Sequence, residues 1–165
     1  MIVSETRDYD TEKVITGVAG KKGFSVISIE KDMMNAEIGF GRRVLEVLED
    51  HEISFEHLPS GIDTMSIVVA TQALEGRRER IINSISRLVR ADHVEILDGL
   101  CLIAVVGRGM VKAKGTAARV FNAVSTAGVN IRMIDQGSSE LNIILGVDED
   151  SYETALSAIF KEFVK

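Results

Sequence analysis

The sequence predicts an α+β fold built from two ferredoxin-like βαββαβ modules, with antiparallel sheets and the helices on one face of each sheet. Three observations lead to this prediction. A stretch of the chain repeats at a constant offset, and each copy alternates β-branched runs with segments of helical spacing. The second copy also lacks one strand, while a strand-like run near the N-terminus has no partner within the first copy.

The repeat aligns residues 39–69 with residues 115–145 without a gap, at an offset of 76 positions. The matched pairs include Gly39/Gly115, Arg43/Arg119, Val44/Val120, Ile53/Val129, Gly61/Gly137 and Ile67/Ile143. Few of the aligned residues are identical. The gapless register and the shared periodicity nevertheless indicate a duplication.

Each copy predicts the same order of elements, from runs that alternate or that carry apolar residues at helical spacing. For the first copy we expect strands at 24–30, 53–55, 65–69 and 93–97 and helices around 44–48 and 76–90. For the second copy we expect strands at 100–106, 129–133 and 141–145 and helices around 120–124 and 152–163.

The second copy has no counterpart of the strand at 93–97 before Lys165, whereas residues 13–19 (KVITGVA) form a strand-like run without a partner. Because exposed sheet edges are a liability, we expect this run to complete the second sheet. The first module, residues 22–98, is then inserted in the second, residues 12–20 plus 99–165. The alternative is that the two ends remain separate edge strands.

Composition narrows the class of protein. The chain is 45% hydrophobic, which is enough for a core, and its formal charge of −6 without dense Lys/Arg argues against nucleic acid. No apolar run approaches the roughly 20 residues of a membrane helix, and no signal peptide is evident. We therefore expect a cytoplasmic protein that binds neither nucleic acid nor membrane.

The residues offer no recognisable catalytic or metal site. His51, His57 and His93 are scattered, and the single cysteine, Cys101, lies in an apolar run typical of a buried thiol. The loop Gly107-Arg108-Gly109 lacks the third glycine of a dinucleotide fingerprint, so a tight turn explains it equally well. We expect no catalytic residues, no metal and no cofactor in this chain.

Both copies contain a loop that leads through a glycine into a helix, and we expect a turn from the following strands to face this loop. In the first copy, residues 32–40 lie opposite Phe55-Glu56 and residues 60–64. Backbone N–H groups at a helix start favour a carboxylate, and Glu56 or Asp63 would hold an ammonium group. The arrangement suits a zwitterionic amino acid, although a plain turn before a capped helix explains it too.

At these residues the sequence resembles the paired ACT domains of the regulatory part of aspartate kinase. The resemblance is carried by residues 14–30 (VITGVAGKKGFSVISIE), 33–69 and 105–150, nearly the whole chain beyond the first ten residues. The most specific features are VITGVAG before one module and the turn Ser138-Ser139-Glu140 in the other.

The resemblance implies a function. Aspartate kinase phosphorylates the side chain of aspartate with ATP, and end-product lysine or threonine binds the ACT pair and inhibits. It thus implies lysine or threonine as effector, a homodimer through the ACT sheets, and a kinase catalytic domain or subunit as partner, where ATP and Mg²⁺ would act. Carried over residue by residue, it implies an effector site of Met33, Asn35, Gly39, Phe40, Phe55, Glu56, Ser60 and Asp63.

Two departures from the family pattern bear on this site. Ser60-Gly61-Ile62-Asp63 stands where lysine-binding relatives have Thr-Ser-Glu, and Lys112-Ala113-Lys114 replaces the usual proline-rich approach to Gly115. The family's catalytic half is absent, so the chain is either a regulatory fragment or a separate regulatory subunit. The alternatives are a structural dimerisation module without effector binding and, less in keeping with the strands, a small independent enzyme.

Overall fold

The computed structural model describes residues 14–163. Its main elements alternate strands and helices along the chain. They are β1 (Gly17–Glu30), α1 (Phe40–Asp50), β2 (Thr64–Ala70), α2 (Arg78–Val89), β3 (His93–Val106), α3 (Thr116–Thr126), β4 (Ile131–Asp135), β5 (Asn142–Asp148) and α4 (Tyr152–Phe163). Short 3-10 turns lie at Met34–Ala36, Thr71–Leu74, Arg108–Met110 and Glu149–Ser151.

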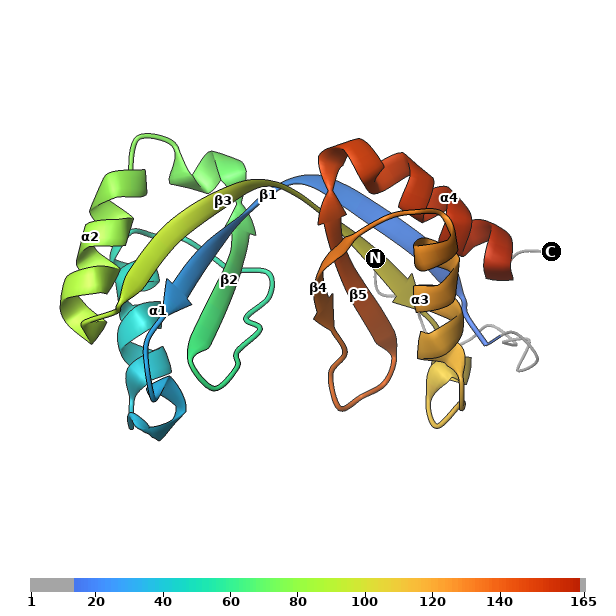
Figure 1. Cartoon of the computed structure of the whole chain (residues 1–165), viewed down its shortest axis with the longest axis horizontal. Helices are drawn as coiled ribbons and strands as arrows, with labels where there is room; N and C mark the ends of the chain where they lie inside the picture. Colours follow the sequence, from blue (N-terminus) through green and yellow to red (C-terminus); the bar gives the residue numbers. More distant parts are fainter. Residues whose placement is uncertain (1–13, 164–165) are drawn as a thin grey trace.

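The strands pair antiparallel in one sheet of order β2-β1-β3-β5-β4. The expected strands at 24–30 and near the N-terminus are continuous in β1, and those at 93–97 and 100–106 are continuous in β3. The antiparallel α+β fold is therefore confirmed, with the two expected sheets joined through these two long strands. Figure 1 shows β1 and β3 crossing together from one half of the molecule to the other.

The two long strands bend where glycines adopt positive φ. Gly23 has φ +88° and Gly99 has φ +73°, a region that favours glycine, and the β1–β3 register shifts between Lys21 and Val26. The bend divides the molecule into a first lobe (residues 24–97) and a second lobe (residues 14–22 and 100–163). Helices α1 and α2 cover the outer side of the first lobe, and α3 and α4 cover that of the second (Figure 1).

The N-terminal part of β1 pairs with the second lobe. Gly17 to Lys21 lie opposite Val106 to Leu102, and the Thr16 N–H donates to the Val106 carbonyl at 2.7 Å. The second lobe thus has the strand order β1-β3-β5-β4. Residues 12 and 13, where the expected second module begins, lie outside the described residues. The module boundaries themselves stay a prediction.

One expected strand is wrong: residues 53–55 form no strand. The chain instead pairs with β2 a little later, through residues 56–60, which we call the edge segment. The Glu56 and Val68 N–H groups donate to the Val68 and His57 carbonyls, at 2.8 and 2.9 Å. Pro59 accepts a bond from Ser66 but has no N–H to donate, so a regular ladder cannot form.

Three apolar clusters hold the fold. One lies under α1 and α2 and contains Ile27, Val44, Ile67 and Ile81; the second lies under α3 and α4 and contains Ile103, Val120, Ile143 and Ala155. The third lies on the other face of the sheet, where the lobes meet, and contains Phe24, Val68, Leu100, Leu102 and Ile144. Each large apolar side chain buried there contributes roughly 1.5–3 kcal/mol, so the lobes pack against each other as well as sharing strands.

Candidate functional site

The loop between β1 and α1 is tied to the turn that precedes β2. Met33 has φ 57°, and its N–H donates to Asp63 Oδ1 at 3.0 Å. The Asn35 N–H donates to the Ile62 carbonyl at 3.0 Å, and the Lys31 N–H donates to the Asp63 carbonyl at 2.9 Å. The structure therefore brings together Met33, Asn35 and Asp63 of the expected site.

Helix α1 starts directly after this loop. Gly39 precedes it with φ 78°, and no side chain caps its first turn. The Phe40 N–H donates to the Glu37 carbonyl at 3.2 Å, while the Phe40 side chain is buried. Phe40 thus anchors the helix start in the core, and the next N–H groups of the first turn point out of the helix end.

A charged clamp that sequence reasoning missed braces the loop. The Glu37 carboxylate contacts both Lys31 and Arg43. Hydrogen bonding to Lys31, helped by the charge of Arg43, holds the pKa of Glu37 below its usual value. Lys31 Nζ also donates to the Val89 carbonyl at 2.6 Å, at the end of α2, and lies 5.8 Å from the centre of the Phe40 ring. The only signal in the sequence was opposite charge on either side of the loop.

Phe55 and Glu56, also expected in the site, lie away from the loop that joins Met33 to Asp63. The Glu56 N–H pairs with Val68, three residues along β2 from Met65, a separation of about 10 Å along the strand. The Glu56 carboxylate is 3.9 Å from Lys21 Nζ, near the bend. Ser60, by contrast, bridges to Met65 and belongs to the turn that carries Asp63. The expected site therefore falls into two groups within one chain.

The second lobe also ties its loop to a carboxylate, at a different position. Lys112 has φ 59°, and its N–H donates to Glu140 Oε2 at 2.6 Å. Gly115, with φ 87°, precedes α3 in the way that Gly39 precedes α1. Ala113 stands at the position of Glu37, so the clamp has no counterpart, and Arg119 pairs instead with Glu162 at 2.8 Å. The two loops are therefore tied by the same kind of contact at different positions, and they differ in their charges.

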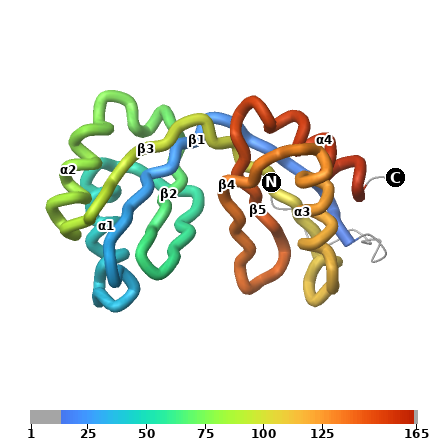
Figure 2. The backbone as a smooth tube through the Cα atoms, in the orientation of Figure 1, coloured from blue at the N-terminus to red at the C-terminus, as the bar shows by residue number. Residues whose placement is uncertain are grey.

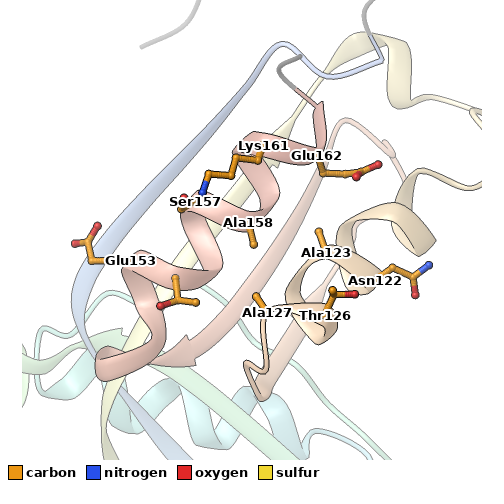
Figure 3. Close-up of a pocket in the computed structure, with 10 residues that line it drawn as sticks. Asn122, Ala123, Thr126, Ala127, Glu153, Ser157, Ala158, Lys161 and Glu162 are labelled. Carbon is orange, nitrogen blue, oxygen red and sulfur yellow. The ribbon is translucent and has the colours of Figure 1, made fainter.

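Two hollows lie away from the loops. A groove of about 750 Å³ separates α3 from α4, and Figure 3 shows Ala123 and Thr126 of α3, with Ala127 directly after it, across from Ala158 of α4. A second cavity, of about 330 Å³, lies between the sheet faces of the two lobes. Neither is lined by Met33, Asn35 or Asp63, so the candidate site is the loop itself.

Other kinds of site find little support. Within residues 14–163, no group of three His, Cys, Asp or Glu side chains is placed to hold a metal ion. In the same range no helix has the length and apolar character needed to cross a membrane. Cys101 is buried, and burial raises the pKa of its thiol, which disfavours the nucleophilic thiolate.

Comparisons with known proteins agree on one family. A family model described as ACT domain matches residues 103–163. Aspartokinase 3 of Bacillus subtilis is 44% identical over 155 residues, which cover 93% of this chain and 34% of that protein. The crystal structure of Clostridium acetobutylicum aspartate kinase, described as an allosteric enzyme, is 48% identical with a TM-score of 0.87, covering 90% of this chain and 34% of that one.

A more distant structure shows likeness of fold alone. Aspartokinase III of E. coli, solved in complex with lysine and aspartate, is 22% identical with a TM-score of 0.78, covering 93% of this chain and 34% of that one. The chain spans about a third of the length of these relatives.

Proposed function

The chain belongs with the ACT-domain regulatory regions of aspartate kinases, and from this premise we propose that it binds an end-product amino acid and thereby inhibits the phosphorylation of aspartate. The activity itself, with its ATP and Mg²⁺, would reside in a catalytic domain or subunit, and no cofactor is proposed for this chain. We place the protein in the cytoplasm.

One observation carries the proposal: the α1 start has no side-chain cap, and the loop that leads into it is tied to the Asp63 carboxylate through the Met33 N–H. An amino acid presents a carboxylate and an ammonium group a short distance apart. The N–H groups at the start of α1 would donate to the carboxylate of the amino acid, because helix starts favour anions. Asp63 would accept from the ammonium group, since a carboxylate that already accepts the Met33 N–H has capacity for more bonds.

Lysine is the effector we favour, with threonine as the alternative. Lysine carries a second ammonium group, which Glu56 would bind, and the E. coli relative was solved with lysine. Within one chain, Phe55 and Glu56 lie about 10 Å along β2 from the Asp63 turn. This separation supports a site completed by a second copy, in a homodimer that associates through its sheets.

Thermal unfolding tests the proposal. The chain is titrated with lysine, threonine and methionine while its melting temperature is followed. A ligand at 100 times its Kd stabilises by roughly 2.7 kcal/mol, a rise of roughly 5–10 °C for a chain of this size. The absence of a shift with all three at millimolar concentration would contradict the proposal. Dimerisation without any thermal response would instead favour a structural role.

A matched pair of variants locates the site. Asp63→Asn keeps an oxygen that accepts the Met33 N–H but removes the charge, so the shift with lysine should be largely lost. Glu140→Gln makes the same change at the Lys112 loop of the second lobe. The shift should survive this change. Equal loss in both variants would show that the effect does not come from the first-lobe loop.

A further inference from the structure

The two lobes touch at a second place, far from the strands that join them. His57 Nδ1 lies 2.7 Å from Asp135 Oδ2, and the two residues are 78 positions apart. Because an ionised carboxylate only accepts, the imidazole donates this bond. His57 belongs to the edge segment of the first lobe and Asp135 ends β4 of the second. In Figure 2 the turquoise chain beside β2 lies on the side of the first lobe that faces β4.

Between this contact and the bend the lobes are not close-packed. The cavity of about 330 Å³ is lined by Ser28, Ser66 and Val68 of the first lobe and by Arg132, Met133 and Ile134 of the second. Protein interiors contain few voids larger than a water molecule, so a hollow of this size separates two surfaces that meet only in part. The lobes are packed at the bend and joined again at the His57–Asp135 contact.

The bend itself is braced from both lobes. The Asp98 carboxylate accepts from Ser25 at 2.6 Å and from both terminal nitrogens of Arg78, at 2.8 and 2.9 Å. The Asp98 carbonyl accepts from Arg132 of the second lobe at 3.2 Å, and Arg132 also donates to Asp148 at 3.0 Å. Gly23 and Gly99 give the strands their change of direction. A movement of the lobes therefore has a defined pivot here.

The edge segment links the His57 contact to the loop before α1. From His57 it runs to Ser60 and continues into the turn that ends at Asp63, whose carboxylate accepts from the Met33 N–H. Pro59 and His57 are each fixed to β2 by one backbone bond, at 2.8 and 2.9 Å. Asp63 and His57 are thus joined by a short stretch of chain that β2 holds at two points.

We propose that the two lobes form a hinged clamp, with the Gly23/Gly99 bend as its hinge and the His57–Asp135 contact as its clasp, and that occupancy of the Met33–Asp63 loop shifts the clasp. The second part of this proposal rests on the proposed function. The first part does not, because hinge, cavity and clasp are features of the chain without ligand. An effector in the first lobe would by this route change the position of the second lobe.

Distances between spin labels test the clamp. Labels are placed on Asn83→Cys in α2 and Ser157→Cys in α4, both exposed positions, while the buried Cys101 stays unlabelled. Doubly labelled chain is mixed with excess unlabelled chain, so that only distances within one molecule are measured. The intact chain should give a narrow distribution. His57→Ala and Asp135→Ala should each add a longer-distance population, with the open-to-closed ratio rising about tenfold for loss of one charged hydrogen bond.

Two further variants complete the design. The His57→Ala/Asp135→Ala double variant should open no further than either single one, because both remove the same contact. Glu46→Gln breaks an exposed ion pair with Arg42 inside the first lobe and should leave the distances unchanged. A label distribution that is the same in Asp135→Ala as in the intact chain would overturn the clamp, whatever happens to the melting temperature.

Lysine then tests the coupling. In the intact labelled chain, lysine at saturation should redistribute the two populations, and in Asp135→Ala this redistribution should be lost while the thermal shift with lysine remains. A thermal shift without any change in the intact chain's distances would overturn the coupling. If lysine, threonine and methionine all fail to shift the melting temperature, the proposed function fails, while the clamp is still judged by the ligand-free distances.

Discussion

The loop before α1 and the loop before α3 are each held by a backbone N–H that donates to a carboxylate, and they carry different charges. Each contains a residue with φ near +58°, Met33 or Lys112, whose N–H donates to a carboxylate in the turn before β2 or β5. Their positions differ, because Met33 precedes a 3-10 turn and Lys112 follows one. Each is followed by a glycine with positive φ that begins the helix. The shared features are those that the fold requires, because they set the direction of the chain into the helix.

The differences lie in what surrounds that backbone. The first lobe braces its loop with Glu37 between Lys31 and Arg43, whereas the second has Ala113 at the position of Glu37 and directs Arg119 to the end of α4. A loop of this kind therefore forms without the Glu37 ion pairs. The extra charges distinguish the first lobe from the second, and the following variants test that contrast.

The largest loss of unfolding free energy is expected from substitutions in the two cores, where the two lobes should behave alike. Ile67 and Ile143 are aligned, and both are fully buried. Ile67→Ala and Ile143→Ala should each lower the free energy of unfolding by about 2–5 kcal/mol, from lost burial and the cavity left behind. Denaturant unfolding measures both. A loss in one variant only would show that the lobes do not unfold as one cooperative unit.

A smaller loss of unfolding free energy is expected from substitutions of the glycines before α1 and α3. Gly39→Ala and Gly115→Ala place a Cβ at φ +78° and +87°, at a cost of about 1–2 kcal/mol each. Gly115 has open space around the added atom, and Gly39 has only an Arg43 nitrogen at 3.4 Å. Similar losses of unfolding free energy are therefore expected. Binding of lysine should weaken in Gly39→Ala alone, which calorimetric titration would show.

The ion pairs of Glu37 with Lys31 and Arg43 should affect the stability of the chain at acid pH. The pKa of Glu37 is lowered in the folded chain, so its contribution is present above its ordinary pKa and is lost as pH falls through the lower folded value. Glu37→Gln should thus be less stable than the intact chain near pH 7, with the gap closing below about pH 4. Thermal unfolding across this range measures the gap. A gap that does not change with pH would contradict the ion-pair account.

Much of the fold follows from local patterns. The helices expected at 152–163 and near 76–90 correspond to α4 and α2, because their buried positions recur at the helical period. No strand forms at 53–55, because three alternating residues are too few to fix a strand. Pro59 and the tied Ser60–Asp63 turn decide where this edge pairs with β2. Such a register is set by tertiary contacts rather than by the segment itself.

The candidate site was predicted only in part. Met33, Asn35 and Asp63 meet because a loop and the next turn are neighbours in any βαββ unit. Lys31 and Glu37 were missed, since no periodicity marks a charge that braces a loop. His57 and Asp135 lie 78 positions apart in different lobes, and nothing in the local sequence relates them. Their contact follows from the bend at Gly23 and Gly99, which only the assembled sheet reveals.

We propose that the first lobe binds an amino acid at the Met33–Asp63 loop and that the second lobe does not bind one at its Lys112–Glu140 loop. The most direct measurement is the lysine-dependent rise in melting temperature of Asp63→Asn beside that of Glu140→Gln. We expect the rise to be nearly abolished in Asp63→Asn and to be unchanged in Glu140→Gln. A full rise in Asp63→Asn, or a loss confined to Glu140→Gln, would contradict it.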